Sequence, residues 1–423
     1  MDKIKVGLIG LGTVGSGVLK TLASFEQIEV VKVAVKNLNK KRDISGLDKS
    51  ILTDNPYEVV RDSSIQIVVE VVGGVEPACD LIKTAIENNK HIVTANKELL
   101  AKKGEELFAL AEKHNKVILY EAAIAGGIPI IMPVKTILAG NKIQKIAAIL
   151  NGTTNYILTK MDVNGASYDE VLKEAQELGY AEADPSGDVE GFDAAYKIAT
   201  LSTIAFNQRI NIKDIYREGI SKIRAEDMKY ANEFGFKIKL IALAQLDEQG
   251  RADVRVHPML VKKSKSLAHI DYVTNAVMID GHPVGEIMFS GPGAGEFPTA
   301  SSVVGDILAI ATELKTTDYP LPMMRCHHGK AANMIDISET MNKYYISINA
   351  NNNVGVIAAL GNSFANNKIS VSSILQKGLR NDNTANIFVI TEKCLEKDLQ
   401  NSISELVANS CINKINSLIR VME

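Results

Sequence analysis

Short apolar runs alternate with stretches of helical periodicity through the first 130 residues of the chain. The runs have the length of buried strands, and the stretches between them carry apolar residues at helical spacing. The expected strands are 4–9, 30–35, 65–72 and 91–94, and the expected helices run from the first glycine turn to about residue 22, over 77–89, and onward from about residue 99. Strands that alternate with helices indicate a parallel sheet covered by helices.

A second pattern begins after residue 339. Its expected strands are 344–349, 369–376, 386–392 and 415–422, and its expected helices are 355–366 and 397–408. The order βαββαβ predicts a ferredoxin-like unit. We therefore expect an α/β protein of three domains: a dinucleotide-binding domain over 1–132, an α+β substrate and dimerisation domain over 133–338, and a ferredoxin-like domain over 340–423. Segment 300–330, which opens with a helix over 300–314, is expected to pack back on the first domain.

A glycine turn follows the first strand and opens the first helix. Its residues are Gly10, Leu11, Gly12, Thr13, Val14 and Gly15. In this G-x-G-x-x-G pattern the glycines permit a tight turn, close approach of a pyrophosphate, and close packing of helix on strand. The helix N-terminus adds partial positive charge for the phosphates. The turn therefore predicts a dinucleotide site.

The end of the second strand indicates which dinucleotide binds. An NAD site usually carries an acid about 20 residues past the glycines, to accept a hydrogen bond from the ribose hydroxyl. Here that position is Lys36, with Lys40, Lys41 and Arg42 close behind. These cations favour the 2′-phosphate of NADP, with NAD as an alternative cofactor. A solvated basic turn is the competing interpretation.

Two lysines lie at positions where functional side chains are expected. Lys97 closes T-A-N-K after the strand over 91–94, at the carboxyl edge of the sheet where ligands bind in such folds. Lys197 lies four residues after Asp193, so a helix places both side chains on one face. A surface lysine that begins a helix, and an acidic turn with one ion pair, are the alternatives.

The segment 182–197 concentrates acids before Lys197. Its carboxylates are Glu182, Asp184, Asp188, Glu190 and Asp193. Acids around a lysine are what an ammonium-bearing substrate requires. Three further stretches, 121–129, 151–155 and 291–299, are rich in glycine, small or polar residues. Each is either a tight connection or a place where the backbone meets a ligand.

Bulk composition excludes several classes of protein. Hydrophobic residues make up 46% and charged residues 23% of the 423, and the net charge of −3 provides no basic field for nucleic acid. No apolar run is long enough for a membrane span, and the N-terminus lacks the pattern of a signal peptide. The 4 cysteines are scattered and the 7 histidines form no H-E-x-x-H motif, which fits a reducing cytoplasm without a catalytic transition metal.

Taken together, the motifs resemble homoserine dehydrogenase across essentially the whole chain. The matching stretches are G-L-G-T-V-G at 10–15, T-A-N-K at 94–97, E-A-A-I-A-G-G-I-P at 121–129, N-G-T-T-N-Y at 151–156, the segment 179–197, and G-P-G-A-G at 291–295. The resemblance implies hydride transfer between L-homoserine and L-aspartate 4-semialdehyde, in the biosynthesis of threonine, methionine and isoleucine. Because no kinase segment precedes the glycine turn, the chain is similar to the monofunctional enzymes.

The family's functional residues match positions of this chain. Lys97 and Lys197 match the catalytic pair, and Glu182 and Asp193 match residues that hold the substrate, with Asp188 nearby. The resemblance further implies a sodium or potassium site of backbone carbonyls at Glu121, Ile124, Gly126 and Ile128. The implied cofactor contacts are Gly10, Gly12, Thr13, Val14, Gly15, Lys36, Thr94, Lys97, Gly179 and Gly295.

Elementary chemistry agrees with these roles. Reduction of an aldehyde builds negative charge on its oxygen, and an ammonium within hydrogen-bond reach, that of Lys197, can donate the proton. A second ammonium, that of Lys97, stabilises the developing alkoxide and lowers the pKa of its neighbour by like-charge repulsion. A carboxylate such as Glu182 can pair with the α-ammonium of homoserine.

The C-terminal domain resembles an ACT domain, an amino-acid-sensing module. The D-x-P-G turn of that family is here Asn352-Asn353-Val354-Gly355, which lacks the aspartate and the proline. Two interpretations stay open: a site for an effector such as threonine, or a dimerisation module without a ligand. In either case we expect a homodimer or a homotetramer.

Three other functions compete with this interpretation. An acylating semialdehyde dehydrogenase needs a cysteine nucleophile, but none of the cysteines lies in a site-like loop. A lactate-type dehydrogenase uses a histidine–aspartate base, and no histidine falls in the motifs. A regulatory protein that senses NADP and an amino acid would not need the two lysines.

Overall fold

The computed structural model describes residues 3–42, 44, 48–317, 320–326, 330–379 and 384–422. The chain forms two compact units, each built from separate stretches of sequence. The first unit comprises Met1–Leu150, Asp193–Ile215 and Thr274–Ala332, and the second comprises Asn151–Phe192, Tyr216–Val273 and Asn333–Glu423. The three domain ranges drawn from the sequence remain a prediction.

A parallel sheet forms the centre of the first unit. Its strands are β1 (Ile4–Ile9), β2 (Ile28–Ala34), β3 (Leu52–Thr53), β4 (Ile67–Glu70), β5 (His91–Thr94) and β6 (Ile118–Leu119). Their order, β3-β2-β1-β4-β5-β6, is that of dinucleotide-binding sheets. The four predicted strands are confirmed. β3 and β6 were not predicted, because two residues are too few to show a period.

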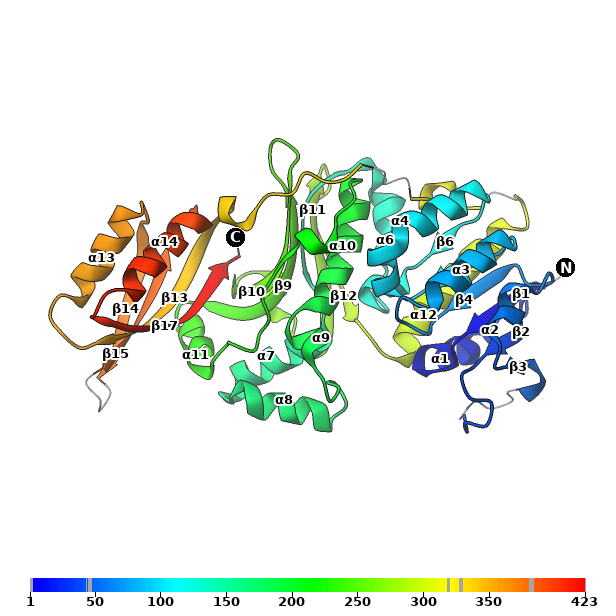
Figure 1. The fold of residues 1–423 in the computed structure, drawn as a ribbon, viewed down its shortest axis with the longest axis horizontal. Coiled ribbons are helices and arrows are strands. Elements are labelled where there is room, and N and C mark those ends of the chain that lie inside the picture. The colour runs from blue at the N-terminus through cyan, green and yellow to red at the C-terminus, as the bar shows by residue number, and fades with distance from the viewer. Residues whose placement is uncertain are drawn as a thin grey trace. The chain divides into compact units, whose positions relative to one another are not determined.

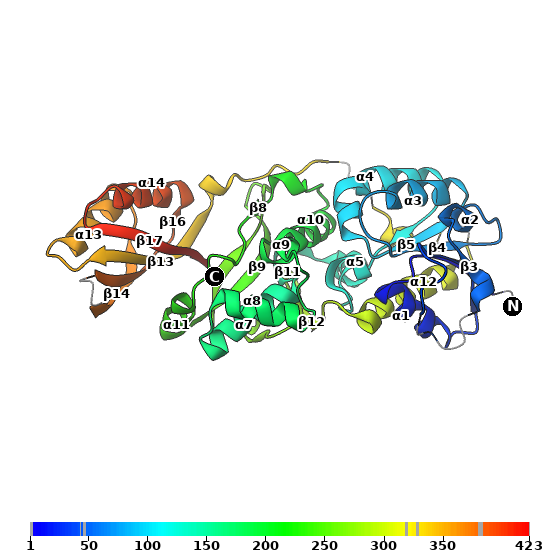
Figure 2. The same cartoon turned by 60° about the horizontal axis from the view of Figure 1, so that its bottom comes forward.

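Helices cover both faces of this sheet (Figure 2). α3 (Ala78–Glu87) and α4 (Lys97–Lys113) lie on one face, and α1 (Thr13–Leu22) and α12 (Glu296–Glu313) lie on the other. A short helix, α2 (Pro56–Val60), follows β3. Apolar side chains of the strands fill the space between the layers; Val6, Val33 and Val68 are fully buried.

α12 packs on α1 although nearly 300 residues separate them along the chain (Figure 1). A Cβ atom on Gly17 would lie 2.7 Å from the carbonyl oxygen of Glu296 and 3.1 Å from the Cβ of Ala300, so only glycine permits this approach. The Lys20 ammonium lies 2.8 Å from the Glu296 carboxylate. The late segment thus completes the helical layer on this face of the sheet.

The remainder of the first unit surrounds an antiparallel group of strands. β11 (Thr274–His282) pairs with both β7 (Lys142–Ile149) and β12 (Gly285–Pro292). The short helices α5 (Ala122–Ala125) and α6 (Ile131–Lys135) follow β6, and α10 (Phe192–Phe206) begins at the last residue of a second-unit segment. Stretch 121–129, expected as a loop, therefore contains one turn of helix.

Up to residue 273, the described residues of the second unit combine strands of a long mixed sheet with four α-helices. β10 (Ala252–Lys262) pairs with β9 (Phe236–Leu246), with the short β8 (Tyr216–Arg217), and with the final strand of the chain. The helices are α7 (Gly152–Asn164), α8 (Tyr168–Glu177), α9 (Ser186–Val189) and α11 (Ala225–Glu233). The acidic stretch 182–197 is thus interrupted by the single helical turn of α9.

The C-terminal part of the second unit has the predicted βαββαβ order. Its elements are β13 (Met341–Asn351), α13 (Val356–Asn366), β14 (Val371–Leu379), β15 (Thr384–Thr391), α14 (Glu396–Val407) and β17 (Ile412–Val421), with the two-residue β16 (Cys394–Leu395) before α14. The sheet order is β17-β13-β15-β14. α13 and α14 cover one face of it (Figure 2). The ferredoxin-like prediction is confirmed, while the ACT-like assignment remains a prediction.

Within the described ranges, no helix combines the length and the apolar composition that a membrane span needs.

Candidate active site

The glycine turn between β1 and α1 depends on the absence of side chains. Gly10 has φ +102°, and a Cβ on it would lie 3.0 Å from the carbonyl oxygen of Val71. A Cβ on Gly15 would lie 2.2 Å from the carbonyl oxygen of Gly10. Gly12, in contrast, faces open space, since nothing lies within 4 Å of its ideal Cβ.

The start of α1 is suited to an anion. Gly12 occupies the N-cap position and supplies no capping side chain, so the first N–H groups of the helix, at Thr13 and Val14, have no side-chain cap. Such N–H groups bind phosphate oxygens readily. Together with the open space at Gly12, they fit the pyrophosphate of a dinucleotide.

The basic turn after β2 is exposed. Lys36 lies two residues beyond the strand, and Lys36, Lys40 and Lys41 all reach solvent. Arg42 instead folds over the turn, and its guanidinium donates hydrogen bonds to the carbonyls of Lys40 (2.9 Å) and Asn37 (2.8 Å). Arg42 therefore stabilises the turn, while the lysines remain exposed.

The T-A-N-K motif is held by a buried acid at the end of β4. Glu70 accepts hydrogen bonds from the Thr94 hydroxyl (2.7 Å) and from the amides of Val72 (2.8 Å) and Gly73 (3.2 Å). Thr94 in turn accepts from the amide of Asn96 (3.0 Å). The ends of the two neighbouring strands are thereby locked together.

Asn96 connects these hydrogen-bonded strand ends to the start of α4. Its side-chain oxygen accepts from the amide of Leu99 (3.1 Å), and its side-chain nitrogen donates to the carbonyl of Gly74 (2.6 Å). This N-cap starts α4 at Lys97, two residues earlier than the apolar pattern predicts. Lys97 is therefore the first helical residue, at the carboxyl edge of the sheet.

One carboxylate joins the two lysines. Asp193, near the start of α10, lies 2.7 Å from the Lys197 ammonium through Oδ2 and 2.5 Å from the Lys97 ammonium through Oδ1. The predicted i,i+4 pair is confirmed, and the second lysine joins it from a different helix. The side chains of Asp193 and Lys197 are each 10% exposed, whereas that of Lys97 is 41% exposed.

The charge state of Asp193 follows from these neighbours. Burial alone would raise its pKa, but the ammonium groups of Lys197 and Lys97 outweigh burial and hold the pKa well below its usual range. Lys197 also donates a hydrogen bond to the carbonyl of Leu150 (2.7 Å). Lys197 is thus fixed by two acceptors, and Asp193 keeps its negative charge at lower pH than an ordinary aspartate does.

The other acids of the segment 182–197 lie in the second unit. Asp188 accepts a hydrogen bond from Asn151 (2.7 Å), whose side chain also caps α7 at the amide of Thr154 (2.9 Å). Glu190 accepts from the Ser221 hydroxyl (2.8 Å), whereas the Glu182 side chain is exposed. The acids therefore differ in their surroundings: Asp188 is fixed by a motif residue, and Glu182 reaches solvent.

The stretch 121–129 uses its only carboxylate for structure. Glu121 accepts from the amides of Ile130 (2.5 Å), Ile131 (2.6 Å) and Met132 (2.7 Å) at the start of α6. Burial raises the pKa of Glu121, and these hydrogen bonds oppose the effect. Because its carboxylate is engaged, Glu121 can offer an ion only its backbone carbonyl.

Glycines close this stretch against the loop after β12. Gly126 has φ +60°, and a Cβ on it would lie 2.3 Å from the carbonyl oxygen of Gly293. A Cβ on Gly293 would lie 1.9 Å from the Asn275 side chain. Among the described residues no group of three or more His, Cys, Asp or Glu could hold a metal. Backbone carbonyls are hard oxygen donors, which suit an alkali cation better than a soft transition metal.

Two predicted cofactor contacts are glycines that an L side chain could not easily replace. Gly179 follows α8 with φ +76°, and Gly295 precedes α12 with φ +118°. Both φ values lie in the positive region that favours glycine over residues with a side chain. Their conformation explains the residue type and leaves their contact with cofactor a prediction.

Sequence reasoning missed two residues that position the site. Glu70 reads as the end of an apolar strand, I-V-V-E, and a buried acid there was a usable signal. Asn151 appeared only as one polar residue of a turn. Its partner Asp188 lies 37 positions away, so no local pattern joins them.

A parallel sheet in dinucleotide order, a glycine turn and a lysine pair at the sheet's edge define a nicotinamide-dependent oxidoreductase. Comparison with known proteins narrows the class. Residues 10–121 match the family model described as "Homoserine dehydrogenase, NAD binding domain", and residues 129–308 match "Homoserine dehydrogenase". The chain belongs to the homoserine dehydrogenase family. It is an oxidoreductase that acts on the CH–OH group of homoserine with a nicotinamide cofactor.

Relatives match over nearly their whole lengths. A homoserine dehydrogenase of Synechocystis is 43% identical, with 99% of each chain covered, and one of Neisseria gonorrhoeae is 39% identical, with 100% of this chain and 99% of that one covered. A crystal structure of homoserine dehydrogenase from Thiobacillus denitrificans aligns with a TM-score of 0.94 at 39% identity, covering 100% of this chain and 99% of that one. A hyperthermophilic archaeal homoserine dehydrogenase in complex with NADPH aligns with a TM-score of 0.62 at 29% identity, over 74% of this chain and 99% of that one.

Proposed function

We propose that Lys197 is the proton donor and acceptor of the reaction and that Lys97 stabilises charge on the substrate oxygen. The observation that carries this proposal is the carboxylate of Asp193 within 2.7 Å of both ammonium groups. The nicotinamide, when bound, exchanges a hydride with the carbon of the substrate. The protein must therefore manage the proton and the oxygen's charge.

The different roles of the two lysines follow from how exposed their side chains are. Lys97 is 41% exposed and begins α4, so its ammonium can approach a ligand at the sheet's edge. Lys197 is 10% exposed, and its ammonium is fixed by Asp193 and by the Leu150 carbonyl. A fixed donor loses little freedom when it moves a proton to the alkoxide. Asp193 positions both lysines and balances their charge.

Substrate binding completes the proposal. Homoserine carries an α-ammonium, and carboxylates are its natural partners. We assign this role to Glu182, which is exposed, and place Asp188 in support, because Asn151 fixes its carboxylate. The motif resemblance supports both assignments, as it does the contact of Asp193 with substrate.

For the cofactor, we propose NADP ahead of NAD. The exposed Lys36 occupies the position at which an NAD site carries an acid, and Lys40 and Lys41 add positive charge. The archaeal relative was solved with NADPH. The turn at Gly10, Gly12, Thr13, Val14 and Gly15 would hold the pyrophosphate. Thr94, whose hydroxyl is taken by Glu70, would contribute backbone, as would Gly179 and Gly295.

We also propose a monovalent cation, Na⁺ or K⁺, at the carbonyls of Glu121, Ile124, Gly126 and Ile128. The closed packing of Gly126 on Gly293 and the engaged carboxylate of Glu121 both favour backbone ligands. The ion would stabilise the stretch between β6 and α6 and would take no part in proton transfer.

The proposal extends to assembly and regulation. A homodimer or homotetramer fits the family resemblance. The turn before α13 has Gly355 at φ +100°, a conformation that supports the proposed ACT-like turn despite the missing aspartate and proline. Threonine is the effector to test there. The cysteines of the described residues are all unpaired thiols, which fits a cytoplasmic location.

The cofactor assignment has a direct test. Oxidation of L-homoserine should be faster per unit concentration with NADP than with NAD, and Lys36→Ala should raise the KM for NADP while leaving the KM for NAD nearly unchanged. Removal of one phosphate contact predicts about a tenfold rise, because hydrogen bonds to charged groups contribute about 1.5–3 kcal/mol. Lys103→Ala, an exposed lysine of α4, is the matched control. Equal effects on both cofactors would contradict the role of Lys36.

A further inference from the structure

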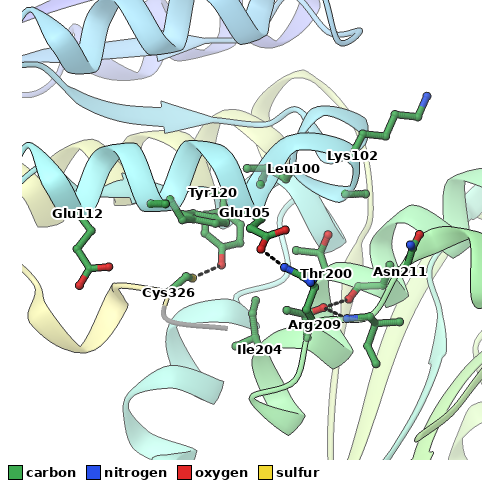
Figure 3. Close-up of a pocket in the computed structure, with 17 residues that line it drawn as sticks. Leu100, Lys102, Glu105, Glu112, Tyr120, Thr200, Ile204, Arg209, Asn211 and Cys326 are labelled. Atoms are coloured by element: carbon green, nitrogen blue, oxygen red, sulfur yellow. Dashed lines mark hydrogen bonds and ion pairs between the residues drawn. The ribbon is translucent and has the colours of Figure 1, made fainter. Parts of the chain in front are cut away.

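A cavity of about 550 Å³ lies between α4 and α10, away from the glycine turn (Figure 3). Its apolar wall is formed by Leu100, Phe108, Ala109, Tyr120, Ile204 and Ile210. This volume is in the range of small-molecule sites. The rest of the lining is polar or charged and includes Lys102, Glu105, Glu112, Thr200, Arg209 and Asn211.

The cavity adjoins the helices that carry the catalytic lysines. Leu100 lies three residues after Lys97 on α4, and Thr200 lies three residues after Lys197 on α10; both line the cavity. A ligand there would contact α4 and α10 at once. Those two helices also meet through the contact of Lys97 with Asp193. A ligand in the cavity would therefore change the distance between the two lysines.

Opposite charges stand together at one end of the cavity. The Arg209 guanidinium forms an ion pair with the Glu105 carboxylate (Figure 3), and their side chains are 35% and 63% exposed. So exposed a pair is held weakly and exchanges readily with another ion pair. A zwitterion can satisfy both partners, with its carboxylate on Arg209 and its ammonium on Glu105, while an apolar side chain enters between Phe108 and Ile204.

We propose that this cavity binds a small α-amino acid with an apolar side chain and thereby acts on the lysine pair. The proposal concerns a site separate from the substrate residues and from the turn at Gly355. It rests on the cavity, its adjacent charges and its two helices, and its binding test needs no enzymatic turnover.

Cys326 provides a reporter at the other end of the cavity. The residue is buried and lines the cavity, where its sulfur lies 3.0 Å from the Tyr120 hydroxyl and 2.9 Å from the Lys135 ammonium. A thiol reagent that reaches this sulfur through the cavity would compete with a bound ligand. Cys411, which is half-buried in the second unit, serves as an internal reference in the same sample.

The experiment measures alkylation of Cys326 by iodoacetamide in the full chain, by peptide mass spectrometry. The probe is L-norleucine, and its comparison compounds are hexanoate and pentylamine, which each lack one of the two charges. With L-norleucine at ten times its dissociation constant, alkylation of Cys326 should slow by about tenfold, because only the free site reacts. Alkylation of Cys411 should not change, and the comparison compounds should protect weakly.

Three variants separate the proposal from binding elsewhere. Ala109→Phe, at an exposed position that lines the cavity, fills it, and Arg209→Gln removes the partner of the carboxylate; both should abolish protection. Lys103→Gln, on α4 outside the lining, should retain it. L-Norleucine should also change turnover in the parent chain and not in Ala109→Phe. Absence of protection, equal protection by hexanoate and pentylamine, protection that survives in both cavity variants, or unchanged turnover despite binding would each overturn the proposal.

Discussion

At the scale of single residues, Asp193 determines the arrangement of the site. It is an anion between two cations from different helices, and it is almost fully buried. Its lowered pKa means that the carboxylate remains ionised where ordinary aspartates begin to take up protons. Both lysines thus keep a negatively charged partner at pH values where an ordinary aspartate would be partly protonated.

Glu70 holds the T-A-N-K motif that ends at Lys97, and replacement of Glu70 should weaken this motif. Glu70→Gln puts an N–H₂ group where one carboxylate oxygen accepts hydrogen bonds, so the buried Thr94 hydroxyl or the amides of Val72 and Gly73 lose their acceptor. We expect the free energy of unfolding to fall by about 1–3 kcal/mol and kcat to fall with it. Urea denaturation and steady-state kinetics measure the two effects. Glu106→Gln, which alters only an exposed pair with Lys83, should change little; equal stabilities of the two variants would contradict this role.

The sequence was informative for residues whose partners are local. Asp193 and Lys197 lie one helical turn apart, and Lys97 closes the short motif after a predicted strand, so spacing and position along the chain brought out all three. Glu70 escaped because its partner Thr94 lies on the neighbouring strand, 24 residues on. Contacts between strands depend on register, which an apolar run does not specify.

At the scale of elements, the stretch from β6 to α6 shows how a single acid can organise a connection. Three consecutive amides at the start of α6 converge on the Glu121 carboxylate. The glycine pattern suggested a loop, but the four residues before the glycines, A-A-I-A, are mostly alanine, the best helix former, and make α5. Composition favoured the wrong element because four residues are too few to show helical periodicity.

Replacement of Glu121 tests this view. Glu121→Gln keeps one acceptor but turns an N–H₂ group toward backbone amides, so the start of α6 should loosen. The expected loss of stability is about 2–3 kcal/mol, the upper range for a buried hydrogen bond to a charged group. Hydrogen exchange should show faster exchange at Ile130, Ile131 and Met132 with α3 unchanged. Unaltered protection of these amides would contradict the assignment.

At the scale of the whole molecule, stability should depend on a buried histidine. His91 begins β5, is 3% exposed, and accepts a hydrogen bond from the amide of Val117 (3.2 Å). Burial, followed by the charges of Lys116 and Arg325, lowers its pKa to about 3. The unfolded chain therefore binds a proton to this residue at a higher pH than the folded chain does.

The lowered pKa of His91 determines how stability changes with pH. The stability that neutral His91 contributes is fully present above the unfolded pKa, about 6.5, and is lost as the pH falls toward 3. At pH 5 the loss is about 2 kcal/mol relative to pH 7.5. His91→Asn keeps an acceptor for Val117 and should remove most of this difference, as measured by urea denaturation at both pH values. An identical pH dependence in the parent and variant would contradict the account.

The sequence predicted part of the packing between segments that lie far apart along the chain. The return of the segment after Gly295 was expected from its apolar helix, and the Gly17 contact shows why α1 accepts α12 there. The short strands at the ends of the parallel sheet were not accessible, since they owe their form to neighbours and not to their own pattern.

The central claim is that Lys197, held by Asp193, moves the proton. The most direct measurement is a single-turnover reduction of L-aspartate 4-semialdehyde by enzyme-bound NADPH in Lys197→Ala, with Lys103→Ala as control and NADPH binding followed by fluorescence. The account predicts a rate constant lower by about 10²–10⁴-fold, the usual contribution of a general acid, with the dissociation constant of NADPH unchanged. A near-normal rate constant in Lys197→Ala would contradict it.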